Sequence, residues 1–200
     1  MSANSIAFNP FATTVAGGLF MTQAAGLIQG TYMDDPATRY QLSGGYLDAS
    51  ETLPMFGGVA ISESIPPAGF DARGSKITRA TAYANLTGFC VFNQNGAAIN
   101  SPQSPVPQIL SQGQVNFFRM GSQAEIVLAI DPALVTDDGG LITQQVSWDF
   151  TNSKIIAFST TALAVKVLSI QTSQCMTVAF DGVNAATWTR TANACARVII

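Results

Sequence analysis

The residues in this sequence with the clearest chemical potential are acidic, and several of them gather in one short run. Asp131 is followed by Asp137 and Asp138, and then by the pair Gly139-Gly140. Calcium prefers several carboxylate and carbonyl oxygens from a turning loop, so this run has ligands of the right type. The spacing is not that of an EF-hand, and Asp-Gly is also a common turn signal. We therefore expect a structural turn rather than a metal site.

Residues for proton transfer or nucleophilic attack are scarce. The chain has no histidine, and its 12 acidic residues allow many accidental carboxylate pairs of the kind used in glycoside hydrolysis. A serine nucleophile would need a lysine as its base, but no lysine lies in an S-x-x-K motif, and no P-loop is present. We therefore expect a protein that is not an enzyme and has no cofactor. The carboxylates that offer such pairs are Asp48, Glu51, Glu63 and Asp149.

Three cysteines, Cys90, Cys175 and Cys195, lie in apolar stretches without a C-x-x-C motif. Zinc would need further ligands from the few carboxylates, so we expect buried free thiols and no metal. A bond between Cys175 and Cys195 remains an open alternative, although nothing marks the chain for secretion.

The composition argues against a nucleic-acid partner and for a partner that covers part of the surface. Only 10% of the 200 residues are charged, 48% are hydrophobic, and the formal net charge is −3. The tightest basic group is Arg73, Lys76 and Arg79, which is more typical of a solvated strand edge than of a phosphate site, so we expect no nucleic-acid binding. Low charge combined with high apolar content favours a surface that a partner covers in part.

The first 50 residues show no targeting signal and little periodicity. The first basic residue is Arg39, and residues 10–28 are interrupted by threonines and a proline, so neither a signal peptide nor membrane insertion is expected. We expect synthesis and retention in a cytoplasm. Residues 1–50 are predicted to form an irregular, extended N-terminal arm, and residues 51–200 a β-sandwich domain.

From about residue 53 onward the pattern is typical of an all-β protein. Short apolar or alternating segments recur at intervals of roughly 8 to 12 residues with turn residues between them, which predicts a jelly-roll-like sandwich or barrel. Val146, Trp148 and Phe150 alternate with Ser147 and Asp149, so the three apolar side chains are expected in the core and the two polar ones on the outside. A single helical turn is expected at 132–135. The expected strands cover residues 53–61, 76–83, 86–93, 114–120, 125–130, 146–150, 154–158, 163–170, 175–180, 185–190 and 197–200.

Two segments are candidates for contact with a partner. The arm carries apolar residues without a helix or strand period. The loop at 96–114 holds three prolines, which favour an extended backbone. Alternatively, the arm is an irregular start that packs on the protein's own core, and the loop is a rigid connector between strands. The candidate contact residues are Ile6, Phe8, Phe11, Pro102, Pro105 and Pro107.

Several of these segments also resemble a known family. Residues 131–150, together with 113–121, 56–63 and the final stretch from Cys175 to Trp188, look like the structural cement (capsid decoration) proteins of tailed bacteriophages. The resemblance covers most of residues 50–200. It implies a small β-rich protein, often jelly-roll-like, that lies on the outer surface of the virion and clamps neighbouring subunits of the major capsid protein. It brings no catalytic residues.

The chain is expected to form a homo-oligomer, and one alternative function stays open. Two-fold dimers are the commonest assemblies, so a homo-oligomer, most simply a dimer, is expected beside the major capsid protein. The alternative is a jelly-roll carbohydrate- or receptor-binding component of the virion. That function would use an exposed aromatic ring, for which Trp188 is the candidate.

Overall fold

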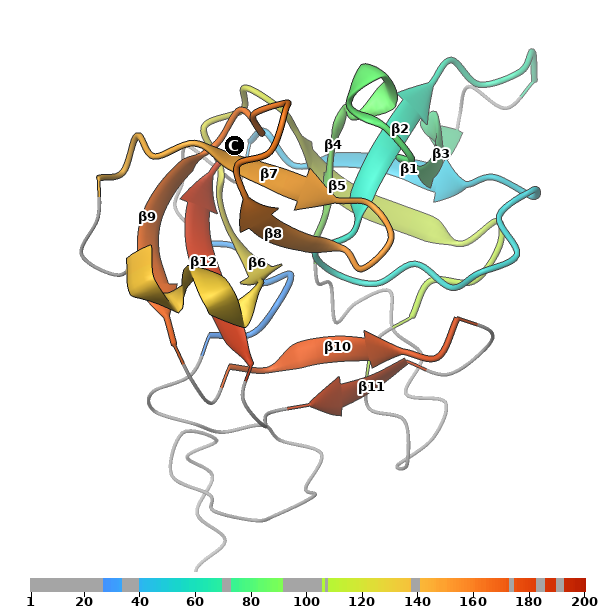
Figure 1. Ribbon diagram of the computed structural model, residues 1–200. Coiled ribbons are helices and arrows are strands. Elements are labelled where there is room, and N and C mark those ends of the chain that lie inside the picture. Colours follow the sequence, from blue (N-terminus) through green and yellow to red (C-terminus); the bar gives the residue numbers. More distant parts are fainter. Residues whose placement is uncertain are drawn as a thin grey trace, which may run out of the picture.

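The computed structural model describes residues 27–33, 40–69, 73–91, 106, 108–137, 141–172, 175–182, 186–189 and 193–200. Over these residues the fold is all-β, as predicted, and one of its sheets is a closed barrel. Figure 1 shows this barrel beside a second sheet, with a two-stranded hairpin below them.

The barrel has five strands in the order β1-β3-β2-β4-β5. β1 runs parallel to β3, and the other neighbours are antiparallel. Closure leaves no free edge among these strands, which removes the usual site of edge-to-edge association. The strands are β1 Ser43–Leu47, β2 Ala60–Ser64, β3 Ser75–Arg79, β4 Gly88–Cys90 and β5 Gln114–Arg119.

The second sheet has the order β7-β8-β6-β12-β9. It curls until its two edges approach each other: the amide of Val167 in β9 donates to the carbonyl of Ile142 at 3.2 Å, and the amide of Leu163 donates to Val146 in β7 at 2.8 Å. Both edge strands are therefore partly covered. The strands are β6 Glu125–Ile130, β7 Val146–Asp149, β8 Lys154–Ala157, β9 Lys166–Gln171 and β12 Ala194–Ile199.

A hairpin and two short helices complete the described chain. β10 (Thr177–Phe180) pairs with β11 (Ala186–Thr189), and Val178, Phe180 and Trp188 pack against the barrel core. The 3₁₀ helices are η2 (Tyr83–Asn85) and η4 (Pro132–Asp137). η4 contains the helical turn that the sequence predicts at 132–135.

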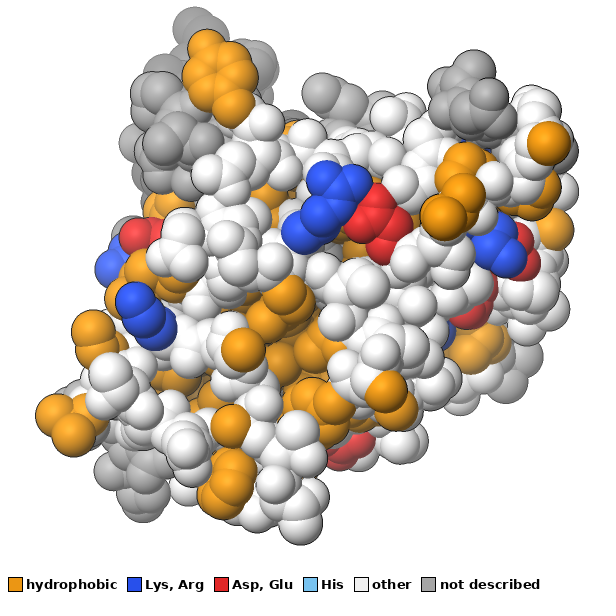
Figure 2. All heavy atoms as spheres, turned by 90° about the horizontal axis from the view of Figure 1, so that it is seen from above, with side chains coloured by type: hydrophobic (Ala, Val, Ile, Leu, Met, Phe, Trp, Pro, Cys, Tyr) orange, Lys and Arg blue, Asp and Glu red, His pale blue; other side chains and the backbone are white. Residues whose placement is uncertain are grey.

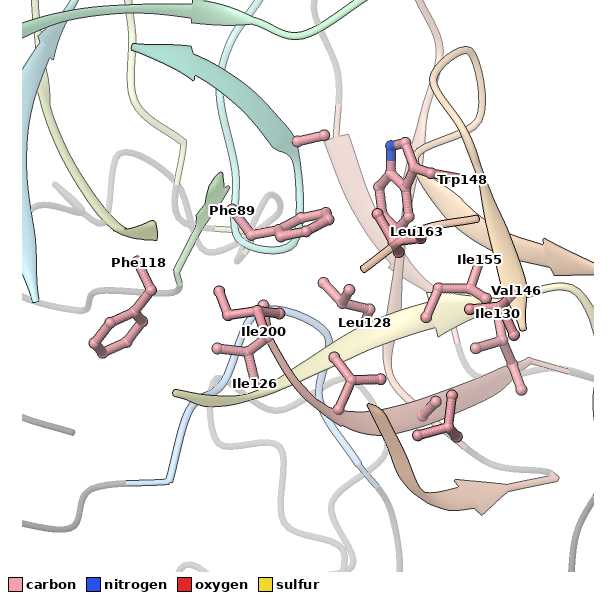
Figure 3. Packing of buried hydrophobic residues seen from close by; sticks show 14 of the residues in the cluster. Phe89, Phe118, Ile126, Leu128, Ile130, Val146, Trp148, Ile155, Leu163 and Ile200 are labelled. Carbon is pink, nitrogen blue, oxygen red and sulfur yellow. The ribbon is translucent and has the colours of Figure 1, made fainter. Parts of the chain in front are cut away.

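Two hydrophobic cores share strand β5. Val115 and Phe117 point into the barrel with no exposed area, whereas Phe118 points outward into the core beneath the second sheet. Alternation of side chains along one strand therefore serves two cores. Figure 3 shows how Phe89 of β4 likewise faces Leu128 and Trp148 of the sheet. Phe89 and Trp148 meet edge to face at a centroid distance of 4.9 Å.

The prediction that the first 50 residues are irregular is wrong for residues 43–47, which form barrel strand β1. The segment shows no strand period in its sequence, but Gly45 lies where β1 approaches β3 closely. A Cβ at Gly45 would lie 2.4 Å from the carbonyl oxygen of Ser75. The strand at 53–61 is also displaced, because only Ala60 and Ile61 belong to β2.

Candidate functional site

One end of the barrel combines exposed apolar side chains with an ordered charge pair. At this end β1 and β3 begin and β2 and β5 end, because Gly45 pairs with Ser75, Ser64 with Lys76, and Ser43 with Phe117. We call this end the barrel rim and define it by Tyr40, Ser43, Glu63, Ile65, Ser75 and Arg119.

A bidentate ion pair lies at the centre of the barrel rim. Nε and Nη2 of Arg119 donate to the two carboxylate oxygens of Glu63 at 2.7 and 2.6 Å. The Ser75 hydroxyl donates to the same carboxylate at 2.5 Å, and Nη1 of Arg119 contacts the Ser43 hydroxyl at 3.0 Å. The hydrogen bonds from Arg119 hold the pKa of Glu63 below its ordinary value. A carboxylate with a lowered pKa is a poor general base. The hydrogen bonds of the cluster instead hold Arg119 in one geometry and order the rim.

Two of the most exposed large apolar side chains belong to the same rim. Tyr40, in the turn before β1, is 89% exposed, and Ile65, directly after β2, is 91% exposed. Pro66 and Pro67 follow Ile65 and restrict its loop. The amide of Glu63 donates to the Thr87 hydroxyl at 2.7 Å, which fixes the strand end that carries Ile65.

Other exposed apolar residues are spread over the molecule. Figure 2 shows apolar side chains in several separate groups on one face, with few charged side chains between them. Away from the rim, Leu110 precedes β5, Leu141 and Ile142 precede β7, and Phe158 follows β8. The rim combines its exposed apolar side chains with an arginine that a bidentate ion pair holds in place.

The basic residues Arg73, Lys76 and Arg79 each contact a different part of the molecule. Arg73 donates to the Gln112 carbonyl at 2.6 Å and stacks over the Tyr46 ring. Lys76 lies 3.6 Å from a carboxylate oxygen of Asp48. The three side chains are thus held by separate partners, and the solvated strand edge expected from the sequence is wrong for Arg79, whose guanidinium is largely buried.

Arg79 attaches the β10–β11 hairpin to the barrel. Its guanidinium carbon lies 5.5 Å from the Phe56 ring centre and 5.8 Å from that of Phe180 in β10, and Nη2 donates to the Pro54 carbonyl. Its Nε is buried without an acceptor among the described residues. Burial lowers the pKa of Arg79, although the charge of Glu51 opposes this effect.

The candidate carboxylates have structural partners, and two of them, Asp48 and Glu51, share one turn, in which the amide of Glu51 donates to the Asp48 carbonyl. Asp131 accepts from Lys154 at 2.7 Å and from the amide of Ala133, and these bonds hold its pKa below the ordinary value. Asp149 accepts from the amides that follow β7, and Asp48 from Ser50. Asp138, Gly139 and Gly140 lie outside the described residues. Among the residues that the structure describes, no group of three His, Cys, Asp or Glu side chains could hold a metal ion.

The tryptophans occupy different environments. Trp148 is 3% exposed and belongs to the core, as predicted. Trp188 of β11 is half-buried and packs against the barrel core, so part of its ring is withdrawn from the open face that sugar stacking would use. This position weakens the carbohydrate-binding alternative.

All three cysteines are buried free thiols, as predicted. Burial raises the pKa of Cys90, inside the barrel, to about 12. Cys175 and Cys195 contact each other beside Val127, and a hydrogen bond from Cys195 lowers the pKa of Cys175 to about 7.

The contact residues expected from sequence, Ile6, Phe8, Phe11, Pro102, Pro105 and Pro107, lie outside the described residues. The sequence does not reveal the barrel rim, because its residues come from four separate segments and only the β pairing brings them together. Among the described residues there is no helix of sufficient length and apolarity to cross a membrane. No family model matches the chain, and no curated protein or solved structure is significantly similar to it.

Proposed function

We propose that this chain is a capsid decoration (cement) protein of a tailed bacteriophage. It is made in the host cytoplasm, binds the outer surface of the head and clamps neighbouring copies of the major capsid protein. The resemblance of residues 113–121 and 131–150 to that family supports the proposal. The observation that carries it is the barrel rim, where Tyr40 and Ile65 are almost fully exposed at the same end of the barrel as an arginine with a fixed orientation.

The residue types on the rim suit protein recognition. Tyrosine and arginine are enriched among the residues that dominate binding energy, and an apolar neighbour completes a small anchor group. Arg119 is still 54% exposed, so its guanidinium has room for a further acceptor on a partner. Its pairing with Glu63 fixes its orientation before binding, which lowers the entropy lost on contact.

A rim of this kind would stabilise a shell by mass action. A protein that binds assembled capsid subunits more tightly than free subunits shifts the equilibrium toward the shell. Two such rims in a dimer, our expected assembly, would span neighbouring subunits and add avidity to individually modest contacts. In this proposal Ile6, Phe8, Phe11 and the prolines Pro102, Pro105 and Pro107 provide additional contacts with the major capsid protein.

The proposal is tested on particles made with and without this gene. Heads from the two strains are purified on density gradients, and the copy number of the protein is measured by quantitative mass spectrometry. We expect many copies per head, in a simple ratio to the major capsid protein, and shells that break at lower temperature when the gene is deleted. A few copies per particle, or shells equally resistant to heat without the gene, would contradict the proposal and favour a receptor-binding component.

A further inference from the structure

Two cysteines far apart in sequence lie side by side where the hairpin leaves the second sheet. Cys175 and Cys195 form a small buried cluster with Val127, and their sulfurs are within hydrogen-bonding distance. Neither residue has exposed area, so an oxidant reaches the two sulfurs only when the β10–β11 hairpin opens locally. The contact is a property of the fold, since Cys175 lies two residues before β10 and Cys195 lies within β12.

Backbone hydrogen bonds hold both positions. Cys195 lies in a central strand of the sheet, opposite Ala129 of β6 on one side and Gln171 of β9 on the other. Next to Cys175, the amide of Met176 donates to the Leu27 carbonyl at 2.8 Å. The Met176 carbonyl in turn accepts from the amide of Gln29, also at 2.8 Å. The two thiols are therefore brought together by chain segments that are themselves paired.

We propose that Cys175 and Cys195 form a reversible disulfide that ties the β10–β11 hairpin to β12. With hydrogen peroxide as the oxidant, the Cys175 thiolate attacks one oxygen, the O–O bond breaks, and the departing hydroxide takes up the proton released from the Cys175 thiol to become water. Cys175 is then a sulfenic acid. The sulfur of Cys195 attacks Sγ of Cys175, the S–O bond breaks, and the hydroxyl leaves as water with the proton of Cys195. Two thiols are oxidised and one peroxide is reduced to two waters.

The environments of the two sulfurs assign the order of attack. The hydrogen bond from Cys195 lowers the pKa of Cys175, which favours its thiolate, while the same bond raises the pKa of Cys195. Cys175, which lies outside the strands, is taken as the attacking thiol, and Cys195, held in the centre of the sheet, as the resolving thiol. Cys90, buried in the barrel with a raised pKa, is an internal control that should stay reduced.

The bond would act as a lock on one part of the molecule. It closes the loop of residues 176–194, which contains the whole hairpin, and so restricts the unfolded chain. This lock does not depend on capsid binding, so a failure of the capsid experiment leaves it standing, and the reverse is also true.

The test compares the reduced and peroxide-treated full-length protein. We expect an intact mass lower by two hydrogens, a cross-linked peptide containing Cys175 and Cys195, and a free Cys90. The unfolding midpoint of the treated protein should rise by about 5 to 10 °C and return on addition of dithiothreitol. Because both samples are the same chain, no variant is needed for this comparison.

Three variants sharpen the result. Cys175→Ala and Cys195→Ala should each abolish the dithiothreitol-sensitive rise, whereas Cys90→Ala should keep it. Cross-linked dimers, sulfinic acid on Cys175 without a cross-link, or thiols that all remain free would each overturn the proposal, and so would a disulfide that leaves the unfolding midpoint unchanged.

Discussion

The barrel and the five-stranded sheet differ in where each keeps its hydrophobic core. The barrel encloses its own, formed by Leu47, Ile77, Phe117 and their neighbours. The sheet's core consists mostly of its own side chains, such as Leu128 and Val198, and residues such as Phe89 and Phe118 that point outward from the barrel complete it. The two cores thus differ in what covers them: the barrel strands surround their core, and the outer face of the barrel closes the core of the sheet.

This difference explains why the rim belongs to the barrel. A closed ladder leaves few ways for its ends to move, so Tyr40, Ile65 and Arg119 can stay exposed without loss of order. The thiols of Cys175 and Cys195, by contrast, lie where the hairpin leaves the sheet. A disulfide between them would give this region a rigidity that the barrel has from packing alone.

Loss of the shared core should have the largest effect. Phe89→Ala removes a fully buried ring that meets Trp148 at 4.9 Å, and we expect the free energy of unfolding to fall by about 3 to 5 kcal/mol. Phe158→Ala, a change at a residue 47% exposed, is the control and should cost less than about 0.5 kcal/mol. Urea unfolding measures both. A loss below about 1 kcal/mol for Phe89→Ala would show that the sheet does not rely on the barrel.

Barrel closure is tested by two adjacent glycines. Gly45→Ala places a Cβ 2.4 Å from the Ser75 carbonyl oxygen, so β1 and β3 must separate, and we expect a loss of about 1 to 3 kcal/mol in unfolding free energy. At Gly44 the nearest heavy atoms to an added Cβ are 3.8 Å away, so Gly44→Ala should be tolerated. Equal stabilities of the two variants in urea unfolding would contradict close strand approach at Gly45.

Hairpin docking should depend on Arg79. Arg79→Ala removes the cation between Phe56 and Phe180, and we expect a loss of about 1 to 2 kcal/mol together with faster amide exchange in β10 and β11. Arg73→Ala, at an exposed arginine of the barrel, is the control and should change neither quantity much. Unchanged exchange in the hairpin of Arg79→Ala would mean that other contacts hold it.

The rim ion pair should give the smallest effect, and its pH dependence has a definite sign. The folded pKa of Glu63 is lowered, so its stabilising contribution is present at neutral pH and is lost as the pH falls through that folded pKa. Glu63→Gln should be less stable than the parent by about 1 kcal/mol at pH 7, because Arg119 is partly exposed. The difference should shrink below about pH 4. A difference that stays constant down to about pH 2 would show that the carboxylate charge is not the cause.

Much of the fold could be predicted because local pattern and tertiary role agree. The apolar run Glu125–Ile130 is strand β6 with the expected bounds, and alternation placed Val146 and Trp148 in the core. Ser147 was expected to face solvent but is buried, because its hydroxyl donates to the Thr161 carbonyl at 2.7 Å. A side-chain bond across 14 residues leaves no trace in a local pattern.

The candidate site could not be predicted in the same way. Tyr40, Glu63 and Arg119 come from separate segments, and only strand pairing brings them to one rim. β1 was missed for a related reason: glycine is normally a turn signal, yet Gly45 serves close strand contact, which depends on the position of Ser75 in another strand.

The most direct measurement is capsid occupancy of two matched double variants. Tyr40→Ser with Ile65→Ser changes the rim, and Leu141→Ser with Phe158→Ser changes exposed apolar residues on the sheet side. Both should keep parental stability within about 0.5 kcal/mol, since all four side chains are exposed. Each protein is added to heads that lack it, and the bound fraction is measured after sedimentation. We predict roughly tenfold weaker binding for the rim variant and parental binding for the control. Parental binding by the rim variant, or an equal loss in both, would contradict the account.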